Sequence, residues 1–131
     1  ILFQRGIYEP EDFKMVKKYN LNLLVTSDDR VQAYISEIME QVKKWIGSQS
    51  IKRLVLVILS KESREVMERW QFDIQIQKNL GQDFVSKKSE SEIQSEIQAI
   101  LRQLTASISF LPILEEQCKF FPLYIHSHGI I

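Results

Sequence analysis

Residues 51–59 read IKRLVLVIL, and this stretch decides the fold. Its unbroken apolar run, from residue 54 to residue 59, is typical of a strand buried on both faces. A polar turn follows, and residues 70–77 then read WQFDIQIQ, in which apolar and polar side chains alternate. This period of two predicts a strand with one buried face and one wet face. Because the two strands are separated by a short turn, we expect them to pair as an antiparallel hairpin.

An amphipathic helix is predicted before the hairpin. Apolar residues recur at steps of three and four from Val31 to Ile46, which is the stripe of a helix with one buried face. Ser27 or Asp28 can cap its start by accepting hydrogen bonds from free backbone N–H groups. We expect Gly47 to end it.

A second helix is predicted after a loop at 78–90. Isoleucine and leucine keep helical spacing over residues 93–111. Ser91 and Gln94 would form a capping box, in which each side chain satisfies the other's backbone donor. Pro112 would stop this helix or follow it closely, since proline cannot continue a helix.

The two ends of the sequence are less regular. Residues 1–6 can be the end of a helix that Gly6 terminates, and residues 21–25 suggest a short strand. Residues 117–126 predict a last strand, which Pro122 confines to a sheet edge or a bulge because proline lacks an N–H donor. This order of elements predicts an α+β domain with helices packed on an antiparallel sheet. The chain opens and closes on apolar residues, so we expect a fragment that is incomplete at both ends.

Composition and charge exclude several classes of protein. A chain of 131 residues with 44% hydrophobic and 26% charged residues is typical of one globular domain. Its 17 basic and 17 acidic residues cancel, whereas a general nucleic-acid binder has a basic excess. We therefore expect no direct nucleic acid and no membrane as a partner. The single Cys118 cannot form an internal disulfide, which favours a reducing compartment.

The sequence lacks a pattern that predicts catalysis. The four glycines form no phosphate-binding cluster. His126 and His128 can share a strand face with Cys118, but a zinc site usually needs a further well-placed ligand. Glu115 and Glu116 resemble a carboxylate pair, yet neighbours in a turn usually point apart and lack the cleft that catalysis needs. We expect a protein that is not an enzyme and that uses no metal or cofactor.

Two other groups of residues have ordinary interpretations. Trp45 and Trp70 lie on the apolar sides of their elements, which favours core packing over a ligand cage. Lys14, Lys17 and Lys18 form a small basic patch of the kind that is most often a solvated face.

The last strand is the informative feature. An edge strand presents unpaired N–H and C=O groups, which aggregate, are covered, or accept another strand. Here the edge carries the apolar residues Phe120, Phe121, Leu123, Tyr124 and Ile125. Strand addition by a peptide is a recognised binding mode. A further segment of the same protein can cover the edge instead, and the sequence leaves both alternatives open.

Several runs of residues resemble one family. Residues 2–8 (LFQRGIY), 23–26 (LLVT), 68–74 (ERWQFDI), 102–105 (RQLT) and 110–115 (FLPILE) are similar to the HORMA-domain proteins of the spindle assembly checkpoint. The likeness covers almost the whole chain. HORMA proteins of translesion polymerase assembly, meiotic chromosome axes and autophagy match these runs less well.

The resemblance implies a fold of three helices on an antiparallel sheet. It also implies that residues 1–131 form a single HORMA domain that lacks most of the first helix and the C-terminal segment called the safety belt. In the family, this belt wraps around a partner peptide on the edge of the last core strand.

The function that the resemblance implies is that of a spindle assembly checkpoint adaptor with open and closed forms. The closed form would bind short motifs of a coiled-coil receptor at the kinetochore and of the activator of the anaphase-promoting complex, which delays anaphase. Open and closed copies would form a homodimer, and a HORMA-remodelling ATPase with its adaptor would act on the protein. The expected locations are the nucleus, the kinetochore and the cytoplasm. The alternative is a HORMA accessory subunit of a translesion DNA polymerase.

The resemblance also assigns a dimer and regulator face. By match to the family, this face holds Gln4, Arg5, Arg102 and Gln103. Their ordinary interpretation is that of solvated polar positions, because surface charges usually contribute little.

Overall fold

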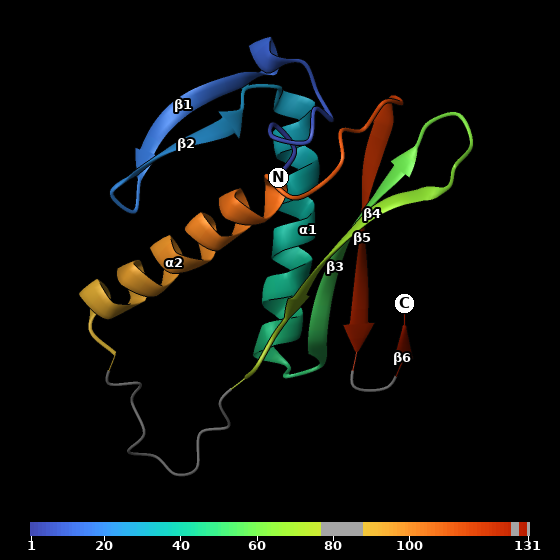
Figure 1. The fold of residues 1–131 in the computed structure, drawn as a ribbon. Helices are drawn as coiled ribbons and strands as arrows, with labels where there is room; N and C mark the ends of the chain where they lie inside the picture. Colours follow the sequence, from blue (N-terminus) through green and yellow to red (C-terminus); the bar gives the residue numbers. More distant parts are fainter. Residues whose placement is uncertain (77–87, 127–128, 131) are drawn as a thin grey trace. The chain divides into compact units, whose positions relative to one another are not determined.

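The computed structural model describes residues 1–76, 88–126 and 129–130, with only the backbone described from residue 123 onward (Figure 1). The chain divides into two compact units. The first unit comprises residues 1–27 and 78–113. The second comprises residues 28–77 and 114–131.

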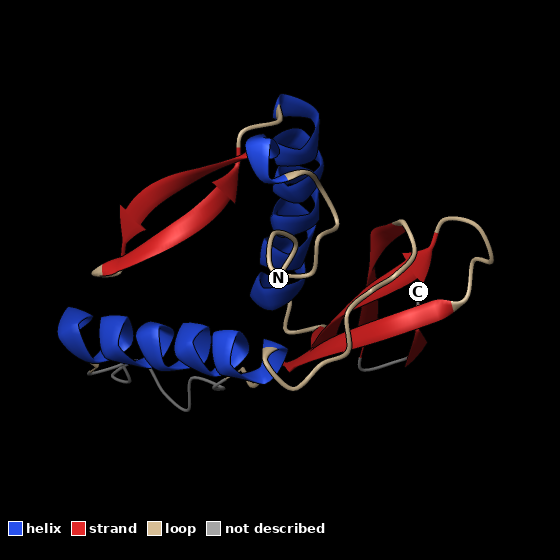
Figure 2. Cartoon of the chain, turned by 45° about the horizontal axis from the view of Figure 1, so that its top comes forward, coloured by secondary structure: helices blue, strands red, loops and turns tan. Residues whose placement is uncertain are grey.

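A four-stranded antiparallel sheet and one helix make up the second unit (Figure 2). The strand order is β4-β3-β5-β6. The elements are α1 (Asp29–Gly47), β3 (Ile51–Ser60), β4 (Val66–Asp73), β5 (Cys118–His126) and β6 (Gly129–Ile130).

Strand β3 forms the centre of this sheet, as its apolar run predicts. It pairs with β4 on one side and β5 on the other, and Val55 and Ile58 are 1% and 0% exposed. The predicted hairpin of β3 and β4 is confirmed, with a bulge between Ile58 and Leu59. Strand β4 ends at Asp73, earlier than the alternation at 70–77 suggests.

The turn of this hairpin is held by the buried Ser60, whose side chain is 0% exposed. Its Oγ accepts hydrogen bonds from the N–H groups of Glu62 and Ser63, at 3.2 and 3.1 Å. Arg64 adopts a positive φ of 62°, which closes the turn. A hydroxyl that satisfies two backbone donors is a common way of stabilising a tight turn.

Helix α1 begins and ends as predicted. Asp28 is the N-cap, and its side chain accepts from the N–H groups of Arg30 and Val31. The expectation that Gly47 ends the helix is confirmed, because Gly47 is the last helical residue. Beyond the helix end, Gln49 takes the left-handed conformation at φ 54°. The hydrogen bonds from its N–H and from the next N–H back to the helix form a Schellman motif.

One face of the sheet lies against α1. The rings of Tyr34 and Phe120 are 5.6 Å apart at a tilt of 56°. Phe120 is opposite Ile58 in the ladder, and two residues along β3 Leu56 is opposite Trp70. Since alternate residues of a strand share a face, the half-buried Trp70 lies on the same face as Phe120. The prediction that Trp70 packs in the core is supported by this register.

The first unit contains a hairpin, of which the sequence predicted only the second strand. Its elements are a 3-10 turn (Pro10–Asp12), β1 (Phe13–Lys18), β2 (Leu21–Thr26) and α2 (Glu90–Ile108). Strand β2 is confirmed, whereas β1 was not predicted. The two strands are joined by Tyr19 and Asn20, which both have positive φ, as a two-residue hairpin turn of type I′ requires.

The chain start in this unit forms a turn with the hydrogen bonds of a helix C-terminus. Gly6 has φ 64°, its N–H bonds the carbonyl of Phe3, and the N–H of Ile7 bonds the carbonyl of Leu2. This is the Schellman pattern, so the prediction that Gly6 acts as a terminating residue is confirmed. The ring of Phe3 meets that of Phe13 edge-on at 5.2 Å.

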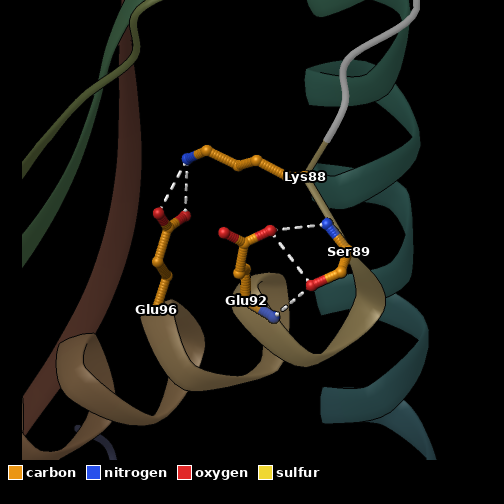
Figure 3. Close-up of polar contacts among 4 residues, drawn as sticks. All are labelled: Lys88, Ser89, Glu92 and Glu96. Atoms are coloured by element: carbon orange, nitrogen blue, oxygen red, sulfur yellow. Dashed lines mark hydrogen bonds and ion pairs between the residues drawn. The ribbon is translucent and has the colours of Figure 1, made fainter.

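Helix α2 begins two residues earlier than the predicted capping box requires (Figure 3). The box is formed by Ser89 and Glu92 and not by Ser91 and Gln94. Glu92 accepts from the Ser89 N–H at 2.7 Å, and the Glu92 N–H donates to the Ser89 Oγ at 3.2 Å. The hydrogen bonds from Ser89, backbone first, lower the pKa of the Glu92 carboxyl. Lys88 adds an ion pair to Glu96 at 2.7 Å.

The expected loop before α2 and the search for a membrane-spanning helix complete the comparison with the sequence. The loop predicted at 78–90 lies almost wholly outside the described residues. Neither described helix has the length and apolarity needed to cross a membrane.

Candidate peptide and dimer interfaces

Strand β5 has one fully paired side and one largely open side. It pairs with β3 along its whole length, from Cys118 opposite Ser60 to His126 opposite Ile51. On its other side, the strand pairing within the described residues is that of β6, at Ile125 and His126. The expectation of an edge strand is therefore met in part, because β6 continues the sheet at one end of β5.

Alternate side chains of β5 have different roles. Phe120 is 8% exposed and packs against the α1 ring of Tyr34, so its side chain belongs to the core. This corrects the expectation that Phe120 is part of an accessible edge. Phe121, its neighbour, is 43% exposed, and the Nζ of Lys119 lies 5.3 Å from its ring centre.

The remaining predicted edge residues can be placed by backbone alone. Leu123, Tyr124 and Ile125 lie in β5, opposite Val55, Leu54 and Arg53. Their side chains lie outside the described part of the structure. A peptide laid on this edge would meet backbone groups first, and each such hydrogen bond contributes about 0.5–1.5 kcal/mol net.

Three of the four predicted dimer-face residues lie together on the surface of the first unit, on helix α2 or beside it. Arg102 and Gln103 are exposed near the middle of α2. The Nε2 of Gln4 donates to Thr105 Oγ1 at 3.3 Å, although the two residues are 101 positions apart. Thr105 is three residues after Arg102, and residues three apart are neighbours on a helix surface. Gln4 thus lies beside the same side of α2 as Arg102.

Arg5 does not have the accessibility that a dimer-face residue needs. It is 8% exposed, and its Nη2 donates to the Pro112 carbonyl at 2.5 Å. The guanidinium thereby ties the chain start to the segment that follows α2. We correct the expectation accordingly, since a side chain buried within its own unit cannot serve as a surface contact.

Sequence reasoning missed two exposed apolar residues that follow α2. Phe110 and Ile113 are 88% and 87% exposed. They flank Pro112, whose carbonyl is the acceptor for Arg5, so this segment is held at a defined place in the unit. The sequence contains an indication of this exposure. These apolar residues continue past the end of the helical stripe, where no predicted element would bury them.

The sites considered for chemistry stay without support among the described residues. Glu115 and Glu116 are both exposed in the segment before β5. Within the described part of the chain, no group of three His, Cys, Asp or Glu side chains is placed to hold a metal ion. His128 and the side chain of His126 lie outside that part. Cys118 is a buried thiol that donates to the Glu116 carbonyl at 3.3 Å.

Comparison with known proteins decides the family. A model of the HORMA domain matches residues 1–126. The chain belongs to the HORMA-domain family. The α+β architecture predicted for this HORMA chain is confirmed by that match and by the antiparallel sheets described above.

Relatives of this HORMA chain include checkpoint proteins of several organisms. It is 51% identical over 122 residues to the mitotic spindle checkpoint component mad2 of Schizosaccharomyces pombe, covering 92% of this chain and 60% of the relative. It is 48% identical over 121 residues to the human mitotic spindle assembly checkpoint protein MAD2A, covering 92% of this chain and 59% of the relative. The HORMA chain thus spans about three fifths of the length of these relatives.

A solved structure gives the same relationship in three dimensions. The HORMA chain matches a chain in the crystal structure of a mitotic checkpoint complex with a TM-score of 0.83 and 47% identity. The match covers 97% of this chain and 66% of the other. The human protein MAD2B is more distant, at 28% identity over 109 residues, 83% of this chain and 48% of that protein.

Proposed function

We propose that this HORMA chain is the central part of a spindle assembly checkpoint adaptor that delays anaphase. The observation that carries the proposal is its 48% identity to human MAD2A, together with its structural match to a chain of a mitotic checkpoint complex. The identity to human MAD2B is lower, at 28%, so the chain is more similar to MAD2A. The proposed adaptor acts by binding and not by catalysis, in the nucleus, at the kinetochore and in the cytoplasm.

The proposed peptide site is the open side of β5. A short motif of a coiled-coil kinetochore receptor, or of the activator of the anaphase-promoting complex, would add to this strand as a further strand. Phe121 offers an exposed apolar contact beside it. Backbone bonds of about 0.5–1.5 kcal/mol each are largely offset by the cost of ordering the peptide. The proposal therefore includes a safety belt, a segment outside residues 1–131, that covers the bound peptide.

The proposed dimer and regulator face is the exposed side of α2. Gln4, Arg102 and Gln103 form its polar part, and the exposed ring of Phe110 extends it beyond the helix end. Arginine and aromatic residues are enriched among the residues that dominate binding energy, which suits Arg102 and Phe110 to that role. A second copy in another conformation, and the HORMA-remodelling ATPase with its adaptor, are the proposed partners. Arg5 supports this face from within and does not contact the partner.

A pair of matched arginine substitutions tests this assignment in the full-length protein. Arg102→Ala should weaken self-association at least about tenfold, as loss of an interface hot spot does, and leave binding of a receptor peptide unchanged. Arg69→Ala is the control, because Arg69 is also exposed but lies on β4. Analytical ultracentrifugation measures the first property and a fluorescence anisotropy titration the second. If Arg102→Ala lost peptide binding but kept self-association, the assignment of the two surfaces would have to be reversed.

Localisation in dividing cells tests the function itself. A fluorescent fusion of the full-length protein should gather at kinetochores in prometaphase, and its depletion should shorten the mitotic arrest caused by a spindle poison. Recruitment to sites of DNA damage without kinetochore signal would instead favour the translesion polymerase alternative.

A further inference from the structure

The sheet face opposite α1 carries exposed apolar side chains. Phe121 on β5 and Arg69 on β4 are both opposite Val57 of the central strand β3. Residues opposite each other in antiparallel strands point to the same side of the sheet, whereas neighbours along one strand point to opposite sides. Because Phe120 faces α1, this row of three lies on the other side. Phe121 is 43% exposed there, while Val57, which lies between the other two, is 6% exposed.

A second row lies on the same side of the sheet, nearer the turn of the β3–β4 hairpin. Lys119 and Val66 are both opposite Leu59, which lies two residues beyond Val57 on β3. Met67 is the extra residue of the bulge in β4, so it has no place in either row. Val66 is 61% exposed and Leu59 is half-buried. The two rows are called the outer patch below, and they consist of Val57, Leu59, Val66, Arg69, Lys119 and Phe121.

The charges of the outer patch are two cations. The Nζ of Lys119 lies 5.3 Å from the centre of the Phe121 ring, and Arg69 is exposed. Neither cation forms an ion pair with a carboxylate of the described residues. On the same side of the sheet β4 also carries Asp73, but this carboxylate is already paired with Arg53. The outer patch therefore presents positive charge that its own surroundings leave uncompensated.

Cationic and apolar side chains alternate at the corners of the outer patch. Lys119 and Arg69 stand at the ends of one diagonal, and Phe121 and Val66 at the ends of the other. The diagonal spans two strand spacings of about 4.8 Å and two residues of about 3.4 Å each, so it measures about 12 Å at the backbone. In an extended segment, residues four apart are about 13 Å apart and point to the same side as the residue midway between them. Two carboxylates at that spacing, with an apolar side chain midway, match the patch.

We propose that the outer patch docks an extended acidic segment of a partner protein with this spacing. Its carboxylates pair with Lys119 and Arg69, and its central apolar side chain covers the patch between them. Charge complementarity decides the class of partner, because the patch holds two cations and the adjoining turn at 61–65 adds two basic and two acidic residues, which cancel. The inference goes beyond the proposed function, whose peptide pairs with the β5 backbone and whose dimer face lies on α2. Phe121 is common to the two sites, so the test variants leave it unchanged.

Nuclear magnetic resonance titration of the full chain, labelled with nitrogen-15, tests the proposal. The probe is a capped peptide with aspartate at its first and fifth positions, leucine at its third and serine at the other two. Amide shifts should move and saturate at residues 57–59, 66–69 and 119–121. The Kd should rise with salt, because exposed charge pairs are screened. A peptide with lysine in place of both aspartates should cause no shifts, and one with serine in place of leucine should bind at least about threefold more weakly.

Charge-reversal variants locate the ionic contacts. Arg69→Glu combined with Lys119→Glu should raise the Kd of the acidic peptide at least about fivefold and should create binding of the lysine peptide. The control is Lys43→Glu combined with Lys52→Glu, since both lysines are exposed in the second unit but lie outside the patch. It should change the Kd less than about twofold. If the spectrum of the first variant is that of an unfolded chain, the corresponding glutamine variant replaces it and should still weaken binding.

A second pair of variants tests the apolar contact. Val66→Ser should raise the Kd at least about twofold, whereas Met39→Ser should not, although Met39 is 51% exposed on α1. Equal weakening by the patch and control variants would overturn the proposal, because it would indicate general charge attraction. Shifts confined to α2 or to the end of β5 that pairs with β6 would also overturn it, because the acidic segment would then bind outside the outer patch.

Discussion

Replacing Arg5 by alanine should destabilise the protein, in contrast to the equivalent change at Arg102. Arg5 is 8% exposed and donates to the Pro112 carbonyl, whereas Arg102 is exposed on α2. A hydrogen bond from a charged group contributes about 1.5–3 kcal/mol. Pro112 itself is exposed, so water can reach its carbonyl in the variant, and the lower end of that range applies.

The buried stem of Arg5 adds to this loss. Truncation to alanine removes methylene groups that are each worth about 0.8 kcal/mol when buried. We therefore expect Arg5→Ala to lower the free energy of unfolding by about 3 kcal/mol, out of the 5–15 kcal/mol typical of a domain. The melting temperature should fall by roughly 10 °C. Arg5→Met keeps most of the stem without the donor, and it should cost about 2 kcal/mol.

Urea unfolding followed by far-ultraviolet circular dichroism measures these changes. Tryptophan fluorescence is the second probe, because both tryptophans belong to the second unit while Arg5 belongs to the first. Coincident transitions would indicate that the two units unfold together. A free energy of unfolding for Arg5→Ala within about 0.5 kcal/mol of the parent, or an equal loss in Arg102→Ala, would contradict this role of Arg5.

Two further predictions concern α2 and the sheet. Glu92→Gln should remove part of the acid sensitivity of α2. The Ser89 hydrogen bonds lower the pKa of the Glu92 carboxyl from 4.5. The stabilisation of the helix by this carboxylate is therefore complete above pH 4.5 and is lost as the pH falls through the lowered pKa. Circular dichroism from pH 7 to about pH 2 on parent and variant measures this, and identical acid transitions would contradict it. Trp70→Ala should cost roughly 2 kcal/mol, below the ~3–5 of fully buried aromatics because Trp70 is only half-buried. A melting temperature within a degree of the parent's would mean that Trp70 does not pack on the face of the sheet that lies against α1.

Capping and termination required more than the local pattern. Two overlapping pairs, Ser89 with Glu92 and Ser91 with Gln94, both match a capping box. The register at which the helix begins decides between them, and the choice of Ser91 was wrong. Helix α1 ends at Gly47 as predicted, and the left-handed residue that completes its termination is Gln49, which the local pattern did not indicate. Energy differences between neighbouring caps are small, so tertiary packing can shift an end by two residues.

The sequence by itself determined the elements with strong periodicity. The apolar run at 51–59, the alternation after it and the stripe of α1 each report burial of the residues that carry them, and the structure has β3, β4 and α1 there. The runs at 68–74 and 102–105 also pointed to the HORMA family before any comparison. Strand β1 was missed because its three lysines mask the alternation. Its formation depends on pairing with β2.

Only the tertiary structure decided which polar and apolar residues are accessible. Arg5 reads as a surface residue, but its side chain is buried and donates to the Pro112 carbonyl, 107 positions away. Phe120 and Phe121 are neighbours of the same residue type. Phe120 is buried because it faces α1, whereas Phe121 is 43% exposed. Burial depends on contacts between segments distant in sequence, and local periodicity carries no information about which segments those are.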